Sequence, residues 1–201
     1  MFLRGSVALP PFGGMLIFKL TWWAIAFGEA ITILDHLYYG GYGTGLNSSF
    51  LGSDVAVHVK MTPKAFVGCS LVLYGAWVRF RCHRTMLQHF TFELSVLKTH
   101  KLVTHGPYSI VRHPGYAGTA TVYVGILLWL GSKGSWLRES GVLSTKAGCA
   151  YAGTIVLWMV GIITSLFSRM RKEDSQLEQV FGKEWMDYAK KVPYRLIPGL
   201  L

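Results

Sequence analysis

Apolar residues gather in four segments of this chain, at 12–34, 65–80, 116–131 and 147–168, and polar residues separate them. At a rise of about 1.5 Å per residue, the first and last segments are long enough to cross a bilayer core, whereas the middle two are short. A fifth span within 38–51 is less favoured, because that stretch is rich in Gly, Ser and Asn. The pattern predicts an all-α, polytopic integral membrane helical bundle with four or five spans.

Composition and charge support this interpretation and suggest an orientation. Of the 201 residues, 51% are hydrophobic and only 15% are charged, with a formal net charge of +10. Six Lys and Arg residues lie in 79–112 and seven in 169–195, whereas the opposite connections carry two and three. The positive-inside rule assigns the richer connections to the cytosol. We expect one membrane domain over 1–201, with 93–118 and 169–201 as cytosolic segments on the same face.

The composition also disfavours two other kinds of protein. No basic stripe interleaved with aromatic residues occurs outside the membrane-flanking loops, so we expect no nucleic-acid partner. The three cysteines, Cys69, Cys82 and Cys149, are widely spaced and odd in number. This arrangement argues against a disulfide framework and against a zinc cluster, and we expect no bound metal.

Polar and helix-breaking residues are concentrated in the loop 100–118, between two apolar segments. Gly106 and Pro107 predict a turn, and Pro114 favours an extended conformation at His113. We therefore expect the backbone N–H and C=O groups of 102–108 to be free of helix bonding and able to bind a polar ligand. Capping of the third span alone would not need so many polar groups.

The C-terminal tail predicts a soluble amphipathic helix over 171–191. Apolar residues recur there at steps of three and four, and they are Leu177, Val180, Phe181, Trp185, Tyr188 and Ala189. Pro193 and Pro198 end this helix and leave 192–201 as a terminal strap. We expect the tail to pack on the loop 100–118.

Arg169 and Glu173 lie four residues apart, where the last span leaves the membrane, so a helix presents both on one face. Taken alone, this spacing is that of an ordinary surface ion pair. On the same side of the membrane as a loop that carries His100, Tyr108 and His113, it indicates a ligand site.

Three motifs occur at fixed spacings over roughly residues 93–198: HKLVTHGPY at 100–108, RHPGYAG at 112–118 and EDSQLEQVFG at 173–182. Together they resemble the isoprenylcysteine carboxyl methyltransferase family, the protein-S-isoprenylcysteine O-methyltransferases. Members of that family often carry a second Glu where this chain has Asp174, and some carry an amide where it has Glu93.

The resemblance implies an integral membrane enzyme that transfers a methyl group from S-adenosyl-L-methionine to the free carboxylate of a C-terminal prenylated cysteine. Arg169 would face that carboxylate as the catalytic and substrate-binding residue. The residues implied to bind the methyl donor are His100, Lys101, Leu102, Val103, Tyr108, His113, Pro114, Gly115, Tyr116 and Glu173. The implied partners are prenylated protein C-termini or prenylcysteine, together with the lipid bilayer.

The resemblance also implies a place in the cell. A eukaryotic chain of this kind, acting in the processing of prenylated CAAX proteins, is expected in the endoplasmic reticulum membrane with its site facing the cytosol. A prokaryotic one is expected in the plasma membrane. Lys19 and Glu29, inside the first apolar segment, receive no role, because snorkelling or burial in the bundle accounts for them.

Three alternatives remain open on the sequence. A phospholipid methyltransferase shares the R-H-P-x-Y turn and an acidic pair but methylates the amine of an ethanolamine lipid. An NADPH-dependent sterol-type reductase is suggested by VPYRLIPG at 192–199, although the chain is short for that class and Glu173 with Asp174 favours a methyltransferase. The third is a membrane scaffold without catalytic activity.

Overall fold

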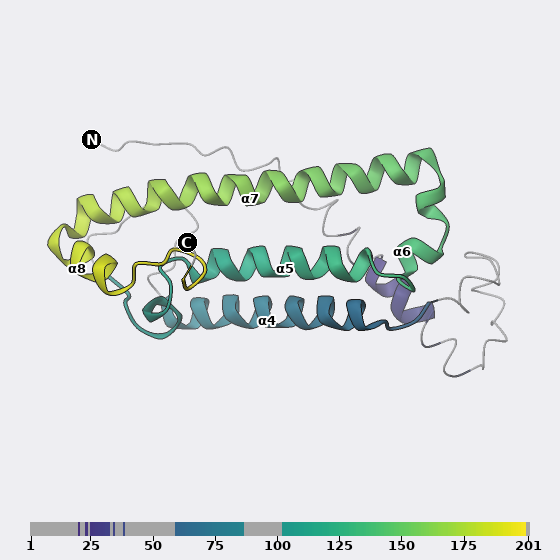
Figure 1. Cartoon of the computed structure of the whole chain (residues 1–201), viewed down its shortest axis with the longest axis horizontal. Coiled ribbons are helices and arrows are strands. Elements are labelled where there is room, and N and C mark those ends of the chain that lie inside the picture. Colours follow the sequence, from purple (N-terminus) through teal and green to yellow (C-terminus); the bar gives the residue numbers. More distant parts are fainter. Residues whose placement is uncertain are drawn as a thin grey trace. The chain divides into compact units, whose positions relative to one another are not determined.

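The computed structural model describes residues 59–86 and 102–199, together with residues 20, 23, 25–32, 34 and 38. Every regular element in these ranges is a helix, which confirms the all-α prediction for the described part of the chain. The elements are α4 (Pro63–Met86), η2 (Gly106–Ser109), α5 (Pro114–Leu130), α6 (Trp136–Glu139), η3 (Val142–Ser144), α7 (Lys146–Phe181) and α8 (Lys183–Lys191) (Figure 1). Lys19, Glu93, His100 and Lys101 lie outside the described residues.

The chain divides into two compact units. Unit 1 comprises Met1–Thr62 and Leu130–Ile155, and unit 2 comprises Pro63–Trp129 and Val156–Leu201. Unit 2 contains α4, η2, nearly all of α5, the second part of α7, α8 and the described part of the strap, residues 192–199. All the described residues that the sequence assigns to the site therefore belong to unit 2.

In unit 1 the described residues 25–32 are helical, and Ile25, Glu29 and Thr32 are buried. The Thr32 hydroxyl donates a hydrogen bond to the Gly28 carbonyl at 2.7 Å, so this buried hydroxyl has its partner within its own helix. Burial of Glu29 in the protein is one of the two explanations that the sequence offered for an acidic residue in the first apolar segment.

Two helices in the described part of the chain, α4 and α7, are long and apolar enough to cross a membrane. Large apolar side chains on both are well exposed: Leu73 on α4 is 72% exposed and Leu157 on α7 is 74% exposed. Apolar faces of this kind are costly in water and suit a lipid environment. The 17 residues of α5 reach only about 26 Å, and the prediction of four or five spans stays a prediction.

The helix α4 extends beyond the apolar segment 65–80 at both ends. The helix runs over Pro63–Met86, which is 24 residues and about 36 Å. Its last two turns carry Arg79, Arg81 and Arg84, which end the apolar pattern without ending the helix. The guanidinium of Arg84 lies 5.0 Å from the Phe80 ring centroid, so this charge is carried above an aromatic face.

The prediction of one separate helix over 171–191 was wrong in its bounds. A single helix, α7, continues from the apolar segment through Phe181, and α8 begins only at Lys183. Gly182 separates them with a positive φ of 50°, a backbone conformation that favours glycine. Trp185 and Tyr188 are buried as the apolar stripe predicts, whereas Val180 is 54% exposed.

Close contact between the α4 and α5 backbones holds unit 2 together at its centre. Gly68 of α4 lies against Gly125 of α5, and Gly75 lies against Gly118, so the two helices run antiparallel side by side (Figure 1). A Cβ added at Gly75 would lie 2.6 Å from the Gly118 carbonyl oxygen, and one added at Gly125 would lie 2.6 Å from that of Gly68. Small residues therefore allow a helix contact that no side chain would fit.

We expect Gly75→Ala to lower the free energy of unfolding by about 1–3 kcal/mol, because its methyl group would push one helix backbone away from the other. The measurement is thermal unfolding of the purified protein in detergent. Gly161→Ala on α7 is the matched control, since an added Cβ there meets nothing within 4 Å. Equal stability of the two variants would contradict the helix contact.

Candidate functional site

A buried carboxylate, that of Asp174, joins three segments of unit 2. His113 Nε2 lies 2.8 Å from Asp174 Oδ1, while Arg112 Nη1 and Arg195 Nε lie 3.3 and 3.1 Å from Oδ2. Asp174 itself is only 5% exposed. A buried carboxylate is stable only with such partners, because its loss of hydration costs several kcal/mol. The loop before α5, the helix α7 and the strap are thereby linked at one point.

Backbone hydrogen bonds reinforce the contact between the loop and the strap. The Arg112 N–H donates to the Tyr194 carbonyl at 3.0 Å, and the His113 N–H donates to the Arg195 carbonyl at 2.9 Å. Arg112 Nη2 also donates to the Pro193 carbonyl at 3.0 Å. The tail therefore does pack on the loop 100–118, as the sequence predicts.

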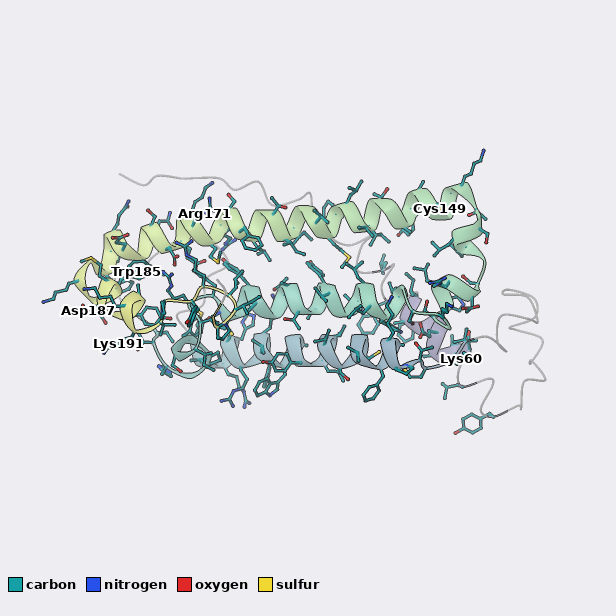
Figure 2. The ribbon with its side chains drawn as sticks, in the orientation of Figure 1. Lys60, Cys149, Arg171, Trp185, Asp187 and Lys191 are labelled. Carbon is teal, nitrogen blue, oxygen red and sulfur yellow. The ribbon has the colours of Figure 1, made fainter. Side chains whose placement is uncertain are left out.

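The helix α8 closes the same end of unit 2. The Arg112 guanidinium lies 5.6 Å from the ring centroid of Trp185, which is labelled in Figure 2. Tyr188 donates its hydroxyl to the Tyr108 carbonyl at 2.8 Å. Burial, offset by Arg112 and reinforced by Asp174, raises the pKa of Tyr188 to about 12, so this hydroxyl remains a neutral donor.

Asp174 lies in the charged part of α7, beyond the apolar segment 147–168. Burial alone would raise the pKa of Asp174, but the His113 hydrogen bond and the charges of His113, Arg112 and Arg195 outweigh burial and lower it. The folded-state pKa is therefore below the unfolded one. The stabilisation is fully present above pH ~4 and is lost as the pH falls through the lower folded-state pKa.

Glu173, the neighbour of Asp174, is directed to α5 instead. The Tyr116 hydroxyl donates to Glu173 Oε2 at 2.7 Å, and Arg169 also interacts with the Tyr116 hydroxyl. The ring of His113 stacks on that of Tyr116, with centroids 5.4 Å apart and planes 6° apart. The structure thus brings together His113, Tyr116, Arg169 and Glu173, four of the residues that the sequence assigns to the site.

Tyr108 lies in η2, where its hydroxyl donates to the Met86 sulfur of α4 at 2.8 Å. Burial, followed by the Cys82 thiol and the Glu173 carboxylate, raises the pKa of Tyr108 above its usual range. Its carbonyl accepts from Tyr188, and Gly106–Ser109 forms a 3-10 helix. The expectation that all backbone groups over 102–108 are free of helix bonding was therefore wrong at its C-terminal end.

The turn at Gly106 is confirmed, with a positive φ of 63°. The chain before it is irregular and includes Leu102 and Val103, both half-buried. Residues 111–113 are irregular, and Pro114 and Gly115 begin α5.

The sequence reasoning did not find the roles of Arg112, Asp174 and Arg195 as one ion-paired group. Arg112 and Asp174 stand within two of the three motifs, and Arg195 lies between the two prolines of the strap. A charged residue between two prolines was the available signal. It gave no indication of the distant residue with which Arg195 pairs.

An apolar pocket opens beside Tyr116, between α5, α7 and the strap. The residues that line it are Tyr116, Ala120, Ile163, Leu166, Phe167, Met170 and Leu196. The pocket is small, with a cavity volume of about 10 Å³, and its lining is apolar apart from the Tyr116 hydroxyl. Among the residues that the structure describes, no cluster of His, Cys, Asp and Glu has the geometry for a metal ion.

The chain is similar in sequence to known methyltransferases. A family described as Phospholipid methyltransferase matches residues 63–143.

Three relatives have related names. A protein of rice (Oryza sativa subsp. indica), named probable protein-S-isoprenylcysteine O-methyltransferase, is 34% identical over 131 residues, covering 64% of this chain and 58% of that protein. Protein-S-isoprenylcysteine O-methyltransferase B of Arabidopsis thaliana is 30% identical, covering 63% and 55%. The Homo sapiens protein-S-isoprenylcysteine O-methyltransferase is 26% identical, covering 67% and 41%. No solved structure gives a significant match.

These matches confirm the resemblance to the protein-S-isoprenylcysteine O-methyltransferases. The chain spans little more than half the length of the two plant relatives and less than half of the human one. All three relatives are named methyltransferases, which does not favour the reductase or the scaffold alternative.

The contact between Tyr188 and Tyr108 gives a direct test of how α8 is attached. We expect Tyr188→Phe to lower the free energy of unfolding by about 1 kcal/mol, because the Tyr108 carbonyl loses this donor. Tyr194→Phe is the control, since Tyr194 is 38% exposed. The check is thermal unfolding of each variant in detergent, and an unchanged midpoint for Tyr188→Phe would contradict the packing of α8 on η2.

Proposed function

We propose that this protein transfers a methyl group from S-adenosyl-L-methionine to the C-terminal carboxylate of a prenylated cysteine and forms a methyl ester. One observation carries the proposal: Arg169 and Glu173 meet Tyr116 on one face of α7, and an apolar pocket begins at Tyr116. A cationic group, a carboxylate and an apolar pocket match the parts of such a reaction. The names of the relatives favour this reaction class.

Glu173 and Tyr116 fit a methyl donor that carries an amino group and ribose hydroxyls. A carboxylate has about four lone-pair sites, so the bond from Tyr116 uses only part of the accepting capacity of Glu173. The remaining residues proposed to line the donor site are Leu102, Val103, Tyr108, His113, Pro114 and Gly115, with His100 and Lys101 outside the described ranges. When bound, S-adenosyl-L-methionine supplies an electrophilic methyl group on a sulfonium.

Alignment is the main task of the protein in this reaction. A C-terminal carboxylate has an ordinary pKa of about 3.5 and is ionised at neutral pH, so no side chain has to act as a general base. The Arg169 guanidinium can orient it through two parallel N–H donors. Holding the reacting atoms about 3–3.5 Å apart contributes several kcal/mol to lowering the barrier.

The apolar pocket supports a prenylated acceptor as the place where its tail would begin: at about 10 Å³ the pocket holds no whole prenyl chain, and the helices would have to part for one. The pocket is lined by α5, α7 and Leu196 of the strap, and it starts at the tyrosine that bonds Glu173. A prenyl tail dissolved in the bilayer could enter sideways between helices, while a polar donor arrives from the water. This arrangement requires a membrane protein, and the exposed apolar faces of α4 and α7 favour one. The distribution of Lys and Arg favours a cytosolic site.

An ethanolamine phospholipid is the competing acceptor, and the description of the matching family gives it a basis. Here the lipid amine, in place of a carboxylate, would be the nucleophile that attacks the methyl group, and a cation at Arg169 would oppose the positive charge that develops on the nitrogen. The names of the three relatives favour the carboxylate acceptor.

Methyl transfer in detergent with both acceptors side by side tests the proposal. We expect the full chain to methylate a farnesylcysteine analogue and not an ethanolamine lipid. Transfer to the lipid alone would overturn the choice of acceptor. Absence of transfer to either, with no binding of S-adenosylhomocysteine by calorimetry, would overturn the proposed function.

Two substitutions on α7 separate the roles of donor and acceptor residues. We expect Arg169→Ala to lower turnover by about 100-fold, because the acceptor loses its orientation, while the affinity for S-adenosylhomocysteine is kept. Glu173→Gln should weaken that affinity instead. Arg171→Ala and Glu178→Gln are matched controls at exposed positions on the same helix, and Arg171 is labelled in Figure 2. A near-normal turnover for Arg169→Ala would remove Arg169 from the mechanism.

A further inference from the structure

Asp174 takes no part in the methyl transfer proposed above, although it follows Glu173 directly. Successive residues of a helix point about 100° apart, so the two carboxylates face different neighbours. Glu173 contacts Tyr116 of α5, whereas Asp174 contacts the loop and the strap. Asp174 is also the more deeply buried of the two. Its role must therefore be sought in what it holds together.

The carboxylate of Asp174 is the anion between two positively charged arginine side chains. The side chains of Arg112 and Arg195 meet its Oδ2 atom, and Arg112 is 11% exposed. Two guanidinium groups held this close in a partly buried site repel each other unless an anion lies between them. Removal of the Asp174 charge would therefore weaken the contact between the strap and the loop and leave it to the hydrogen bonds that Arg112 and His113 donate to the strap carbonyls.

A continuous series of contacts leads from this ion-paired group to the residues proposed to bind the donor. His113 contacts Asp174 through its ring nitrogen and stacks the same ring on Tyr116. Tyr116 in turn donates to Glu173. A shift of the His113 ring would move the Tyr116 hydroxyl and, with it, the Glu173 carboxylate.

The strap also reaches the other side of the site. Arg195 meets Asp174, and the next residue, Leu196, lines the apolar pocket. The His113 N–H donates to the Arg195 carbonyl, so the strap backbone is fixed between these two contacts. The position of Leu196 thus depends on the ion pair of its neighbour.

We propose that Asp174 is a positioning residue that binds the strap to the loop through Arg195, Arg112 and His113, and thereby sets both the Tyr116–Glu173 pair and the Leu196 wall of the apolar pocket. In this role Asp174 would act without contacting the donor or the acceptor. This role rests on the proposed function, because it names what aligns the same site. It assigns one carboxylate to the coupling of two substrate positions.

The test compares Asp174→Asn, Arg195→Gln and the double variant in the full chain. We expect each single variant to weaken S-adenosylhomocysteine binding about tenfold and to raise the KM of a farnesylcysteine analogue, as loss of an orienting residue does. The double variant should bind S-adenosylhomocysteine no more weakly than the weaker-binding single variant, because both substitutions remove the same contact between Asp174 and Arg195. A merely structural role would lower thermal stability without this shared loss of affinity.

Controls and rescue sharpen the comparison. Asp187→Asn and Lys191→Gln change exposed charges on α8, both labelled in Figure 2, and should bind the probe as the unaltered protein does. Arg195→Lys keeps the positive charge and should recover much of the affinity. It also keeps the test decisive if Asp174→Asn fails to fold, because Arg195→Gln and Arg195→Lys then give the comparison.

A second measurement does not depend on catalysis. Chymotrypsin cleavage after Tyr194, followed by mass spectrometry, reports release of the strap and should be faster in Asp174→Asn and Arg195→Gln. Binding and cleavage equal to those of the unaltered protein, or effects that multiply in the double variant, would overturn the role of Asp174. If the unaltered protein neither binds the probe nor transfers a methyl group, the proposed function fails, and the positioning role fails with it. If the unaltered protein binds the probe and transfers a methyl group, and the variants match it in binding and cleavage, the positioning role alone fails.

Discussion

Burial of one carboxylate among three cationic or ionisable partners organises the functional end of unit 2. Asp174 draws together a loop, a helix and a strap that are far apart in the sequence. Such a buried group adds little net stability when all its partners are present, because desolvation offsets most of the attraction. Loss of the carboxylate would be far more costly, since Arg112 and Arg195 would be left charged and close together. Its contribution is therefore to specify one arrangement of the chain.

The glycine contact between α4 and α5 supplies the rigid base for this arrangement. Gly118 lies two residues after Tyr116 and packs on Gly75, so the start of α5 is fixed against α4 close to the site. Backbone contact leaves little freedom for one helix to slide along the other. The loop that precedes α5 is therefore anchored at its C-terminal end, where Arg112 and His113 contact Asp174 directly before α5 begins.

The sequence predicted the helical class, the Gly106 turn and the packing of the tail on the loop, because glycine, proline and apolar periodicity act locally. It failed where helix continuity or pairing decided the outcome. The apolar pattern stops near Arg79, although α4 continues to Met86. The change from apolar to charged residues suggested a break in a helix that in fact continues to Phe181. The partner of Arg195 lies in a distant segment, which spacing along the chain does not reveal. Residue types along the chain indicated the region of the candidate site, whereas the contacts among its side chains depend on the tertiary structure.

The unbroken course of α7 has a consequence for how this chain tolerates insertions. Ile163 lines the apolar pocket and Glu173 bonds Tyr116, and both depend on the same run of helix. One extra residue between them would rotate Glu173 by about 100° relative to Ile163 and turn it away from α5. An insertion of about seven residues, or two turns, would restore the direction, but it would move Glu173 by about 10 Å along the axis. The separation of these two positions is thus fixed in both phase and length, even though neither touches the other.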